Sequence, residues 1–488
     1  MAGVFALAGA ACGGGTGEAT RTPSASAPAS SSGTPSVSTS GAGPSPSAGS
    51  SEEAAVTQPL VIVMHATRPP LDISDKLAGR VVAGVVESWS ELASGPSRAL
   101  RVVAAPGIGA AEALEVASTR AALQAVVRDR EVVAVIPAAA AGPQVQAVTV
   151  DGIDPFRQPG EYPLRTAASD STGPVVTMSV AGDIMLGRGV AEAARGSGDP
   201  VLALRPMQRR LASADVTVGN LESTLSRAGA PTQGGDSFAV EPAVLEGLRD
   251  AGFDVLDLAN NHLGDFGDRA LVQTVRRLRD GGLRTFGAGR NPRRAWQPAV
   301  VERSGVRFGF LGFNAIGETP EVGPGQPGAV SVSMPPRTGP LDRAELDRFL
   351  RAVRRLDGRV DVVVVFPHSG TQYTNVPEPI QRRVARRLVA SGADLVAGGH
   401  PHWVQGAEMV GGRLVVHSLG NFVFDMDFME ETQQGLLLEL TFWGSDPKAA
   451  RFVPYAMDEN FAPRVQSYRA GLDTLRLMWE TGGPAFHR

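Results

Sequence analysis

The chain has 488 residues, of which 43% are hydrophobic and 20% are charged, and its formal net charge at pH 7 is -4. This length and composition predict a mostly globular protein with two or three domains. A slightly acidic balance offers no basic stripe of the kind that holds nucleic acid, so we expect no nucleic-acid partner.

The first twelve residues resemble a lipoprotein signal. The apolar stretch MAGVFALAGAA is too short to span a bilayer, and it ends in small residues before Cys12. The resemblance implies lipidation at Cys12 and a protein attached to the cell membrane outside the cytoplasm. Two departures are the lack of a basic residue before the apolar run and Gly9 in place of the usual leucine. The alternatives are a cleaved signal peptide or a disordered tail.

Residues 13–57 consist mainly of Ser, Thr, Pro, Gly and Ala, with almost no large apolar side chain. Such a segment cannot bury enough surface to offset the entropy of ordering, so we expect a disordered tether. Because Cys12 is the only cysteine, we also expect neither disulfides nor a thiolate metal site.

A first globular segment is predicted at residues 58–168, an accessory α/β domain. Apolar runs and helical periodicity predict a strand, a helix, a strand and a helix passing into a strand, at 59–74, 75–92, 98–107 and 121–137. Residues 72–92 and 149–166 resemble parts of phosphate-type periplasmic binding proteins. The matching stretch is too short for two complete lobes and shows no phosphate-binding loop. The resemblance therefore implies an accessory domain of that descent and not a working phosphate receptor.

Beyond a polar joint at 168–173, valine-rich runs alternate with amphipathic segments through a second domain at 175–460. Near-continuous apolar strands separated by helices are typical of an α/β fold whose sheet is buried on both faces. The predicted strands are 175–182, 215–220, 253–259, 308–313, 360–367, 393–399 and 413–420, with helices at 268–282 and 379–392. Residues 435–444 and 448–457 should form a closing antiparallel pair, and we expect 461–488 to be a tail.

Polar residues recur at the carboxyl ends of these predicted strands, where open α/β sheets bind their ligands. The clearest motif is the pair His400 and His402, because a His-x-His bend can aim both rings into one space. Taken singly, each such residue could instead be a helix cap, a turn residue or a satisfied loop histidine. Oxygen and imidazole ligands without sulfur suit Zn, Mn, Fe or Mg ions. The residues in question are Asp183, Asn220, Glu222, Asn260, Asn261, His262, His368, His400, His402, Asn421 and Asp425.

The ordered motifs GDIMLGR, GNLES, LANNHLGDFG, FPHSG, GGHPHWVQ and HSLGNFVFD resemble the CapA family of capsule and poly-γ-glutamate synthesis proteins. That family is a branch of the calcineurin-like metallophosphoesterase fold. The resemblance covers residues 175–455 and implies a layered α/β/β/α domain holding one or two divalent metal ions. Matched motif by motif, it implies six metal ligands: Asp183, Glu222, Asn261, His368, His400 and His402.

The resemblance further implies that His262 acts as general acid and that Asn220, Asn260, Asn421 and Asp425 support the ligands. Met185 departs from the parent pattern, because it stands where the first motif of the fold has a histidine. One metal position is therefore short of a ligand. Arg188, just beyond Asp183, is a candidate to pair with an anionic substrate, although it could equally be a solvated surface residue.

The implied function is a metal-dependent hydrolase that acts on a polyglutamate-like polymer or another anionic envelope glycopolymer. The alternative is a non-catalytic subunit that binds the polymer within a membrane complex for synthesis, export or attachment. Met185 favours the second interpretation, and the presence of His262, His368, His400 and His402 favours the first. His417 lies inside an apolar run and is predicted to be a core residue or to support the ligands, whereas His65 and His487 are assigned no role.

Overall fold

A computed structural model describes residues 56–94, 96–109, 112–168 and 172–488. The predicted signal segment, Cys12 and the tether as far as residue 55 lie outside the described residues. The described residues belong to one compact unit, Ala55–Arg488, so the predicted division near residue 168 stays a prediction. No helix in these described ranges is long and apolar enough to cross a bilayer.

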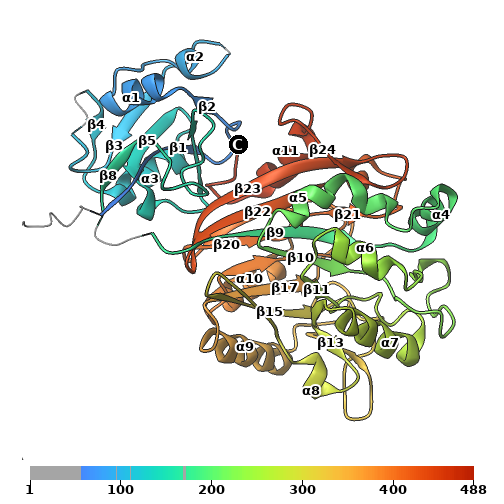
Figure 1. The fold of residues 1–488 in the computed structure, drawn as a ribbon. Coiled ribbons are helices and arrows are strands. Elements are labelled where there is room, and N and C mark those ends of the chain that lie inside the picture. The colour runs from blue at the N-terminus through green and yellow to red at the C-terminus, as the bar shows by residue number, and fades with distance from the viewer. Residues whose placement is uncertain (1–55, 95, 110–111, 169–171) are drawn as a thin grey trace, which may run out of the picture. The chain divides into compact units, whose positions relative to one another are not determined.

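The N-terminal segment is built on a six-stranded sheet (Figure 1). Its strands are β1 (Thr57–His65), β3 (Arg101–Ala104), β4 (Leu114–Glu115), β5 (Val132–Pro137), β6 (Val145–Ala147) and β8 (Arg165–Ala167). The helix α3 (Thr119–Arg128) and the small pair β2 (Asp72–Ile73) and β7 (Thr149–Val150) complete it. This arrangement confirms that a smaller α/β region precedes the larger part of the chain.

One predicted helix of this segment is two helices. Residues 75–92 were expected to be continuous, but α1 (Asp75–Ala83) ends at Gly84 and α2 (Trp89–Leu92) begins after Ser88. Gly84 adopts φ +81°, the left-handed conformation that ends helices, and Ser88 forms a capping box with Glu91. These two local stop and start signals outweigh the apolar periodicity that runs across them.

The larger part contains two sheets. The first has eight strands in the order β12-β11-β10-β9-β22-β23-β24, with β21 paired to β9. The second has six strands in the order β14-β15-β17-β18-β20-β19. The first comprises β9 (Val175–Ile184), β10 (Val216–Leu221), β11 (Val255–Asp257), β12 (Arg284–Phe286), β21 (Asn421–Val423), β22 (Gln434–Trp443), β23 (Asp446–Met457) and β24 (Pro463–Val465). The second comprises β14 (Ala299–Arg303), β15 (Val306–Asn314), β17 (Val362–His368), β18 (Leu395–Ala397), β19 (Ala407–Val410) and β20 (Arg413–Val416).

Alternate residues of the strands divide between three apolar cores, which places the two sheets face to face. Val362 and Val364 of β17 pack with Met178 and Val180 of β9 between the sheets. The intervening Val363 instead packs outward with the helices of the second sheet. Because successive side chains of a strand point to opposite faces, a valine run can serve two cores at once. The single buried sheet that the valine runs suggested is thus two stacked sheets.

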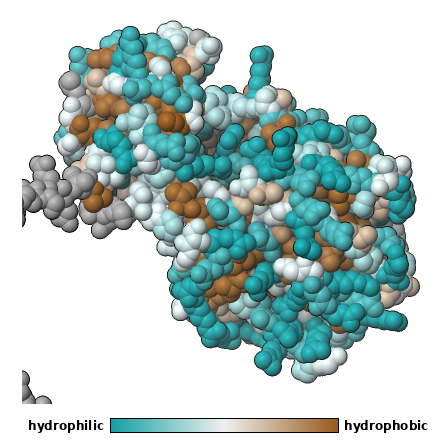
Figure 2. Space-filling view, in the orientation of Figure 1, coloured by the Kyte–Doolittle hydropathy of each residue, from teal (hydrophilic) through white to brown (hydrophobic). Residues whose placement is uncertain are grey.

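Helices cover the outer face of each sheet and complete the α/β/β/α layers expected from the family resemblance (Figure 1). The first sheet is covered by α4 (Arg188–Ser197), α5 (Gln208–Ala212), α6 (Val244–Asp250) and α7 (Gly267–Asp280). The second is covered by α9 (Arg343–Asp357) and α10 (Pro379–Val389), with the short α8 (Pro292–Ala295) beside a small pair, β13 (Ala288–Gly289) and β16 (Gly328–Ala329). The face in Figure 2 is mostly hydrophilic, with apolar residues in separate small patches, as this burial of the strands requires.

The closing pair is confirmed, because β22 and β23 are antiparallel. Residues 461–488, expected to be a tail, instead form β24 and α11 (Leu472–Thr481). Leu475, Met478 and Trp479 of α11 enter the core between the two sheets, together with Phe486. Burying a large apolar side chain is worth about 1.5–3 kcal/mol, which holds this segment in place.

Candidate metal centre

The predicted ligands converge at the carboxyl ends of strands from both sheets. Asp183 in β9 pairs in register with Asn220 of β10 and Asn421 of β21. In the second sheet, His368 ends β17 and forms a bridge with Gly399, which follows β18. All six predicted ligands are buried: Asp183, Glu222, Asn261, His368, His400 and His402.

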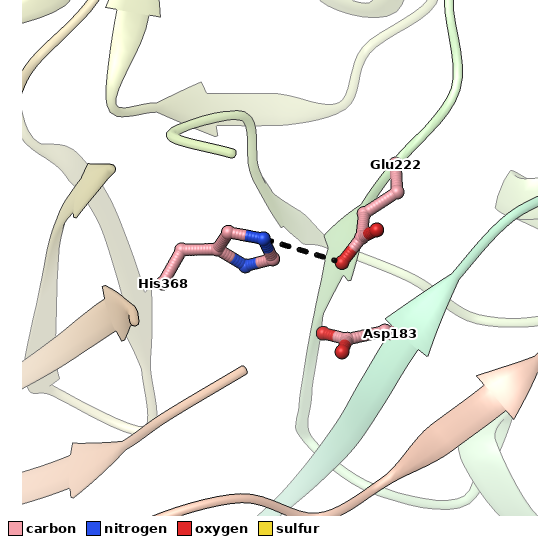
Figure 3. A group of neighbouring side chains, drawn as sticks. All are labelled: Asp183, Glu222 and His368. Atoms are coloured by element: carbon pink, nitrogen blue, oxygen red, sulfur yellow. Dashed lines mark ion pairs between the residues drawn. The ribbon is translucent and has the colours of Figure 1, made fainter. Parts of the chain in front are cut away.

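One group of three side chains has the spacing of a metal site. Ligand atoms of Asp183, Glu222 and His368 all lie within 4.8 Å of one another (Figure 3). His368 Nε2 lies 3.6 Å from Glu222 Oε1 and 2.9 Å from Asn261 Oδ1. Asn261 therefore joins this group through His368. Carboxylate, amide oxygen and imidazole together form a donor set for divalent ions of the Zn, Mn, Fe or Mg class.

Two buried carboxylates side by side need compensation by positive charge. Burial raises the pKa of Asp183 to about 6. Burial, and then the charge of Asp183, raise the pKa of Glu222 well above its usual range. The Nδ2 of Asn220 donates to Asp183 Oδ1 at 2.8 Å and to Glu222 Oε1 at 2.9 Å, but an amide carries no net charge. A bound cation would offset the repulsion that remains.

The His400 and His402 bend folds back onto Asp183. The backbone N–H of His400 donates to Asp183 Oδ2 at 3.0 Å, and His402 Nδ1 lies 3.8 Å from the same oxygen. Both histidines have positive φ, 94° and 60°, a strained conformation that costs of order 1–3 kcal/mol at a non-glycine residue. A Cβ on Gly399 would stand 2.5 Å from Asp183 Oδ1, so only glycine permits this close approach.

Several buried polar atoms of this cluster have no hydrogen-bond partner in the part of the chain that the structure describes. They are Glu222 Oε2, His400 Nδ1, His400 Nε2 and His402 Nε2. An unsatisfied buried polar atom costs about 1–3 kcal/mol, so a set of them at one place requires a reason. Burial lowers the pKa of His402 to about 4 and those of His368 and His400 well below the usual range. Neutral imidazoles are metal ligands, and His400 and His402 have ring nitrogens without a partner among the described residues, so these two residues fit a divalent ion.

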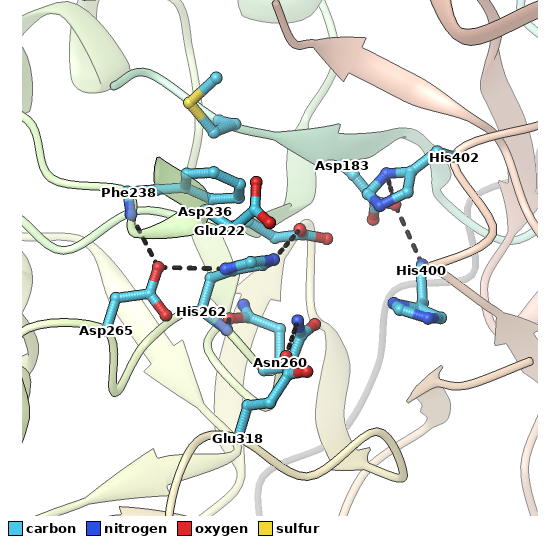
Figure 4. A network of polar contacts seen from close by, with 12 residues as sticks. Asp183, Glu222, Asp236, Phe238, Asn260, His262, Asp265, Glu318, His400 and His402 are labelled. Carbon is cyan, nitrogen blue, oxygen red and sulfur yellow. Dashed lines mark hydrogen bonds and ion pairs between the residues drawn. The ribbon is translucent and has the colours of Figure 1, made fainter. Parts of the chain in front are cut away.

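His262, the predicted general acid, lies beside the carboxylates (Figure 4). Its Nε2 is 4.0 Å from Glu222 Oε2, and its Nδ1 is 3.0 Å from Asp265 Oδ2. The imidazole stacks on Phe238 with ring centroids 4.0 Å apart. Asp265 also accepts from the backbone N–H of Phe238 at 2.7 Å. This second hydrogen bond holds the Asp265 carboxylate in position, and the carboxylate in turn orients the His262 ring.

Of the residues predicted to support the ligands, some contact the ligands and others contact residues beside them. Asn260 donates to Asn220 Oδ1 at 2.9 Å and accepts the backbone N–H of His262, so it ties the end of β10 to the loop after β11. Asn421 Oδ1 lies 2.8 Å from His402 Nδ1 and holds that ring. Among the four expected, Asp425 contacts Arg188 rather than a ligand.

Arg188, the candidate for pairing with an anionic substrate, pairs with a carboxylate of this chain in the structure. Two donors on one edge of its guanidinium, Nε and Nη2, contact the Asp425 carboxylate, and Nε lies 3.1 Å from Oδ2. The guanidinium also lies over the Phe238 ring, 4.5 Å from its centroid. A bidentate ion pair satisfies these donors, so Arg188 holds the wall behind His262, and pairing with a substrate stays a prediction.

Three functional neighbours were not predicted from the sequence. Asp265 follows His262 by three residues in NNHLGD, a spacing that could have indicated a pair. Glu318 accepts from Asn261 Nδ2 at 2.7 Å and pairs with Arg337, also at 2.7 Å, and no local signal points to either residue. Met185, in place of the expected histidine, is buried in the apolar core and provides no ligand.

The remaining histidines contact residues outside the centre. His417 pairs with Glu408 at 2.8 Å, His65 contacts Thr67 Oγ1 at 2.9 Å, and His487 contacts the Trp479 carbonyl at 2.8 Å.

Comparison with known proteins agrees with this geometry. The family described as "Bacterial capsule synthesis protein PGA_cap" matches residues 177–426, which include every residue of the centre. The chain belongs to this capsule synthesis family. The PGA_cap region carries strands of both sheets and all six predicted ligands, and its buried Asp, Glu and His cluster is compatible with a divalent metal ion.

Relatives of this PGA_cap chain have related names. It is 31% identical to the capsule biosynthesis protein CapA of Bacillus anthracis over 54% of this chain and 63% of that protein. It is 29% identical to the PGA biosynthesis protein CapA of Bacillus subtilis, over 54% of this chain and 67% of that one. A probable polyglutamine synthesis accessory protein of Mycobacterium tuberculosis is 25% identical to this chain, over 61% of this chain and 87% of that protein. The chain thus spans less than two thirds of the Bacillus anthracis relative.

Solved structures are more distant. A hypothetical protein from Thermus thermophilus aligns with 57% of this chain and 99% of its own, at 17% identity and a TM-score of 0.37. An ABC-type phosphate transport receptor from Vibrio cholerae aligns with 22% of this chain and 54% of its own, at 16% identity and a TM-score of 0.20. At these scores neither similarity supports an argument, and the descent of the N-terminal segment stays a prediction.

Proposed function

We propose that this protein is a metal-dependent hydrolase that acts on a poly-γ-glutamate-like or other anionic envelope polymer during capsule synthesis. The observation that carries the proposal is the set of unpartnered buried atoms on Glu222, His400 and His402 around the Asp183 carboxylate, within the described part of the chain. The names of the relatives support the polymer class.

Asp183, Glu222, Asn261, His368, His400 and His402 would hold the ion, or two ions. A divalent metal bound there would polarise the scissile group and lower the pKa of water to about 7. The side chains of Asn220 and Asn421 would keep the ligands oriented, through the hydrogen bonds to Asp183, Glu222 and His402.

His262 would protonate the leaving group. Asp265 accepts at Nδ1, which leaves Nε2 on the Glu222 side of the ring as the atom that holds and transfers a proton. Phe238 covers one face of the imidazole, and the Arg188 guanidinium, which pairs with Asp425, lies over the same phenyl ring. His262 is only 6% exposed. General acid help from such a residue contributes about 10²–10⁴-fold to the rate.

The second candidate is a non-catalytic subunit that grips carboxylates of the polymer within a membrane export or attachment complex. Met185 favours it, because an apolar side chain fills the core position where the parent motif has a ligand. Under either candidate, we propose attachment to the membrane through lipid on Cys12. Replacement of Cys12 by Ser should release the protein from the membrane fraction, and unchanged fractionation would refute the anchor.

Metal content and turnover distinguish the two candidates. Purified protein should contain a divalent ion by elemental analysis and should shorten poly-γ-glutamate or release glutamate or phosphate from envelope polymers. His402→Gln should lose both properties, whereas His417→Gln, another buried histidine outside the centre, should keep them. If the wild-type protein contained no metal and showed no turnover, the hydrolase proposal would be refuted. If it contained metal but showed no turnover, the non-catalytic binding subunit would be the supported candidate.

A further inference from the structure

A cavity lined by several arginines lies away from the metal centre, between the N-terminal segment and the C-terminal residues of the compact unit. It has a volume of about 300 Å³, and none of the metal-centre residues lines it. The lining residues that matter here are Arg68, Trp89, Arg98, Arg130, Glu131 and Arg488.

Positive charge exceeds negative charge among the described side chains of this cavity. Glu131 is the sole carboxylate side chain among them, and it is shared by Arg68 at 2.6 Å and Arg98 at 3.6 Å. Arg130 and Arg488 have no ion pair with any described residue. Burial, and then the positive charges of Arg488 and Arg68, lower the pKa of Arg130.

Two hydrogen-bond donors on residues that line the cavity are also unused among the described residues. Arg130 Nε and Trp89 Nε1 are buried without an acceptor, and Trp89 is only 6% exposed. A native structure rarely leaves such donors unpaired, since each costs about 1–3 kcal/mol. Missing acceptors and surplus positive charge at one place indicate the same absent partner, an anion with several oxygens.

The cavity is rigidly framed. Arg68 donates twice to the Arg130 carbonyl, at 2.9 and 2.6 Å, and its guanidinium lies over the Trp89 ring, 3.6 Å from the centroid. Arg130 in turn donates to the Thr67 carbonyl at 3.3 Å. Donors that are already positioned lose little entropy when a ligand arrives.

We propose that this cavity is a binding site for an oxyanion group, either a carboxylate or a phosphate, held by Arg130 and Arg488 with Trp89 Nε1 as a neutral donor. Guanidinium groups bind both groups through paired N–H donors, so the two sources share one recognition chemistry. The proposal is independent of the metal centre and of the polymer's hydrolysis.

Calorimetric titration of the full chain with inorganic phosphate and with tri-γ-glutamate tests the site and separates the two sources. At least one of them should bind saturably, with an affinity that falls as salt is added. Arg130→Gln should weaken binding about tenfold or more, the effect of losing a charged hydrogen-bond donor. Arg488→Gln, a change at an exposed residue that leaves folding intact, should weaken it in the same direction.

Two controls locate the effect. Arg101→Gln removes an equal charge from an exposed pair with Asp129 outside the cavity, and should leave binding unchanged. In an Asp183→Asn background, Arg130→Gln should weaken binding as much as it does in the wild-type background, so failure of this site is distinguishable from failure of the hydrolase. No saturable binding of either anion, or binding that neither cavity substitution weakens, would overturn the proposal.

Discussion

His262 Nδ1 lies 3.0 Å from Asp265 Oδ2, so a carboxylate three residues further along the chain orients the imidazole whose other nitrogen faces Glu222. The pair resembles the acid–base pairs in which a carboxylate sets the tautomer of a histidine and stabilises its charged form. Orientation and proton transfer therefore depend on a residue that would bind no metal.

Asp265→Asn should lower kcat about 10–100-fold while KM and metal content stay close to wild type, because the ligands are untouched and only the proton donor loses its orientation. Steady-state kinetics on the hydrolysed polymer, with elemental analysis of the same sample, measure both quantities. Asp268→Asn is the matched control, since the Asp268 carboxylate contacts Gln326 at the surface. An unchanged kcat in Asp265→Asn would remove His262 from the proposed mechanism.

His400 and His402 should respond differently to replacement by phenylalanine in metal-free protein. His400→Phe should change the free energy of unfolding by less than about 1 kcal/mol, because neither ring nitrogen has a partner to lose among the described residues. His402→Phe should cost about 1–3 kcal/mol, because Asn421 Oδ1 then loses its partner in the core.

Urea unfolding after chelation measures both costs, and calorimetric metal titration should show that both variants have lost affinity. A large destabilisation by His400→Phe would mean that the His400 ring forms a stabilising contact within the protein. It would contradict the expectation that both ring nitrogens are free to bind a metal ion.

His65 should make stability depend on pH outside the metal centre. Burial lowers the pKa of His65 to about 4, against an ordinary value of 6.5. The unfolded chain therefore takes up a proton as the pH falls below about 6.5, whereas the folded protein does not until about pH 4. The stabilisation is present above pH 6.5 and is lost as the pH falls to 4, by about 3 kcal/mol in total.

Urea unfolding at several pH values checks this sign. His65→Gln should flatten the wild-type profile between pH 4 and 6.5, and His487→Gln, at an exposed histidine, should not. Parallel profiles for wild type and His65→Gln would contradict the expectation.

Trp479→Ala should destabilise the protein by about 3–5 kcal/mol, because this side chain is 2% exposed and packs between the two sheets. Arg476→Ala on the same helix should change stability by less than about 0.5 kcal/mol, since Arg476 is 52% exposed. Thermal or urea unfolding compares the two. Equal, small effects would show that residues 461–488 are the tail that the sequence suggested.

Much of the fold is local in origin and could be predicted. Valine runs such as VDVVVVFP bury both faces of a strand, and amphipathic segments such as PIQRRVARRLV must lie on its outside. The ligand types could also be predicted, because Asp183, His368 and the His400 bend each stand directly after a recognisable apolar run. The one helix predicted across Gly84 failed where a left-handed cap interrupted the periodicity.

The sequence by itself determined the order of strands and helices, the positions of the polar residues at strand ends and the chemistry that those residues can perform. Only the tertiary structure decided that Asp425 neutralises Arg188 from 237 residues away, that Asp265 orients His262, and that α11 closes the core between the two sheets. The physical reason is that the alternation of apolar side chains indicates which residues are buried, but not which distant residues they pack against. Partners are chosen by packing and by the pairing of buried charges across long separations in the chain.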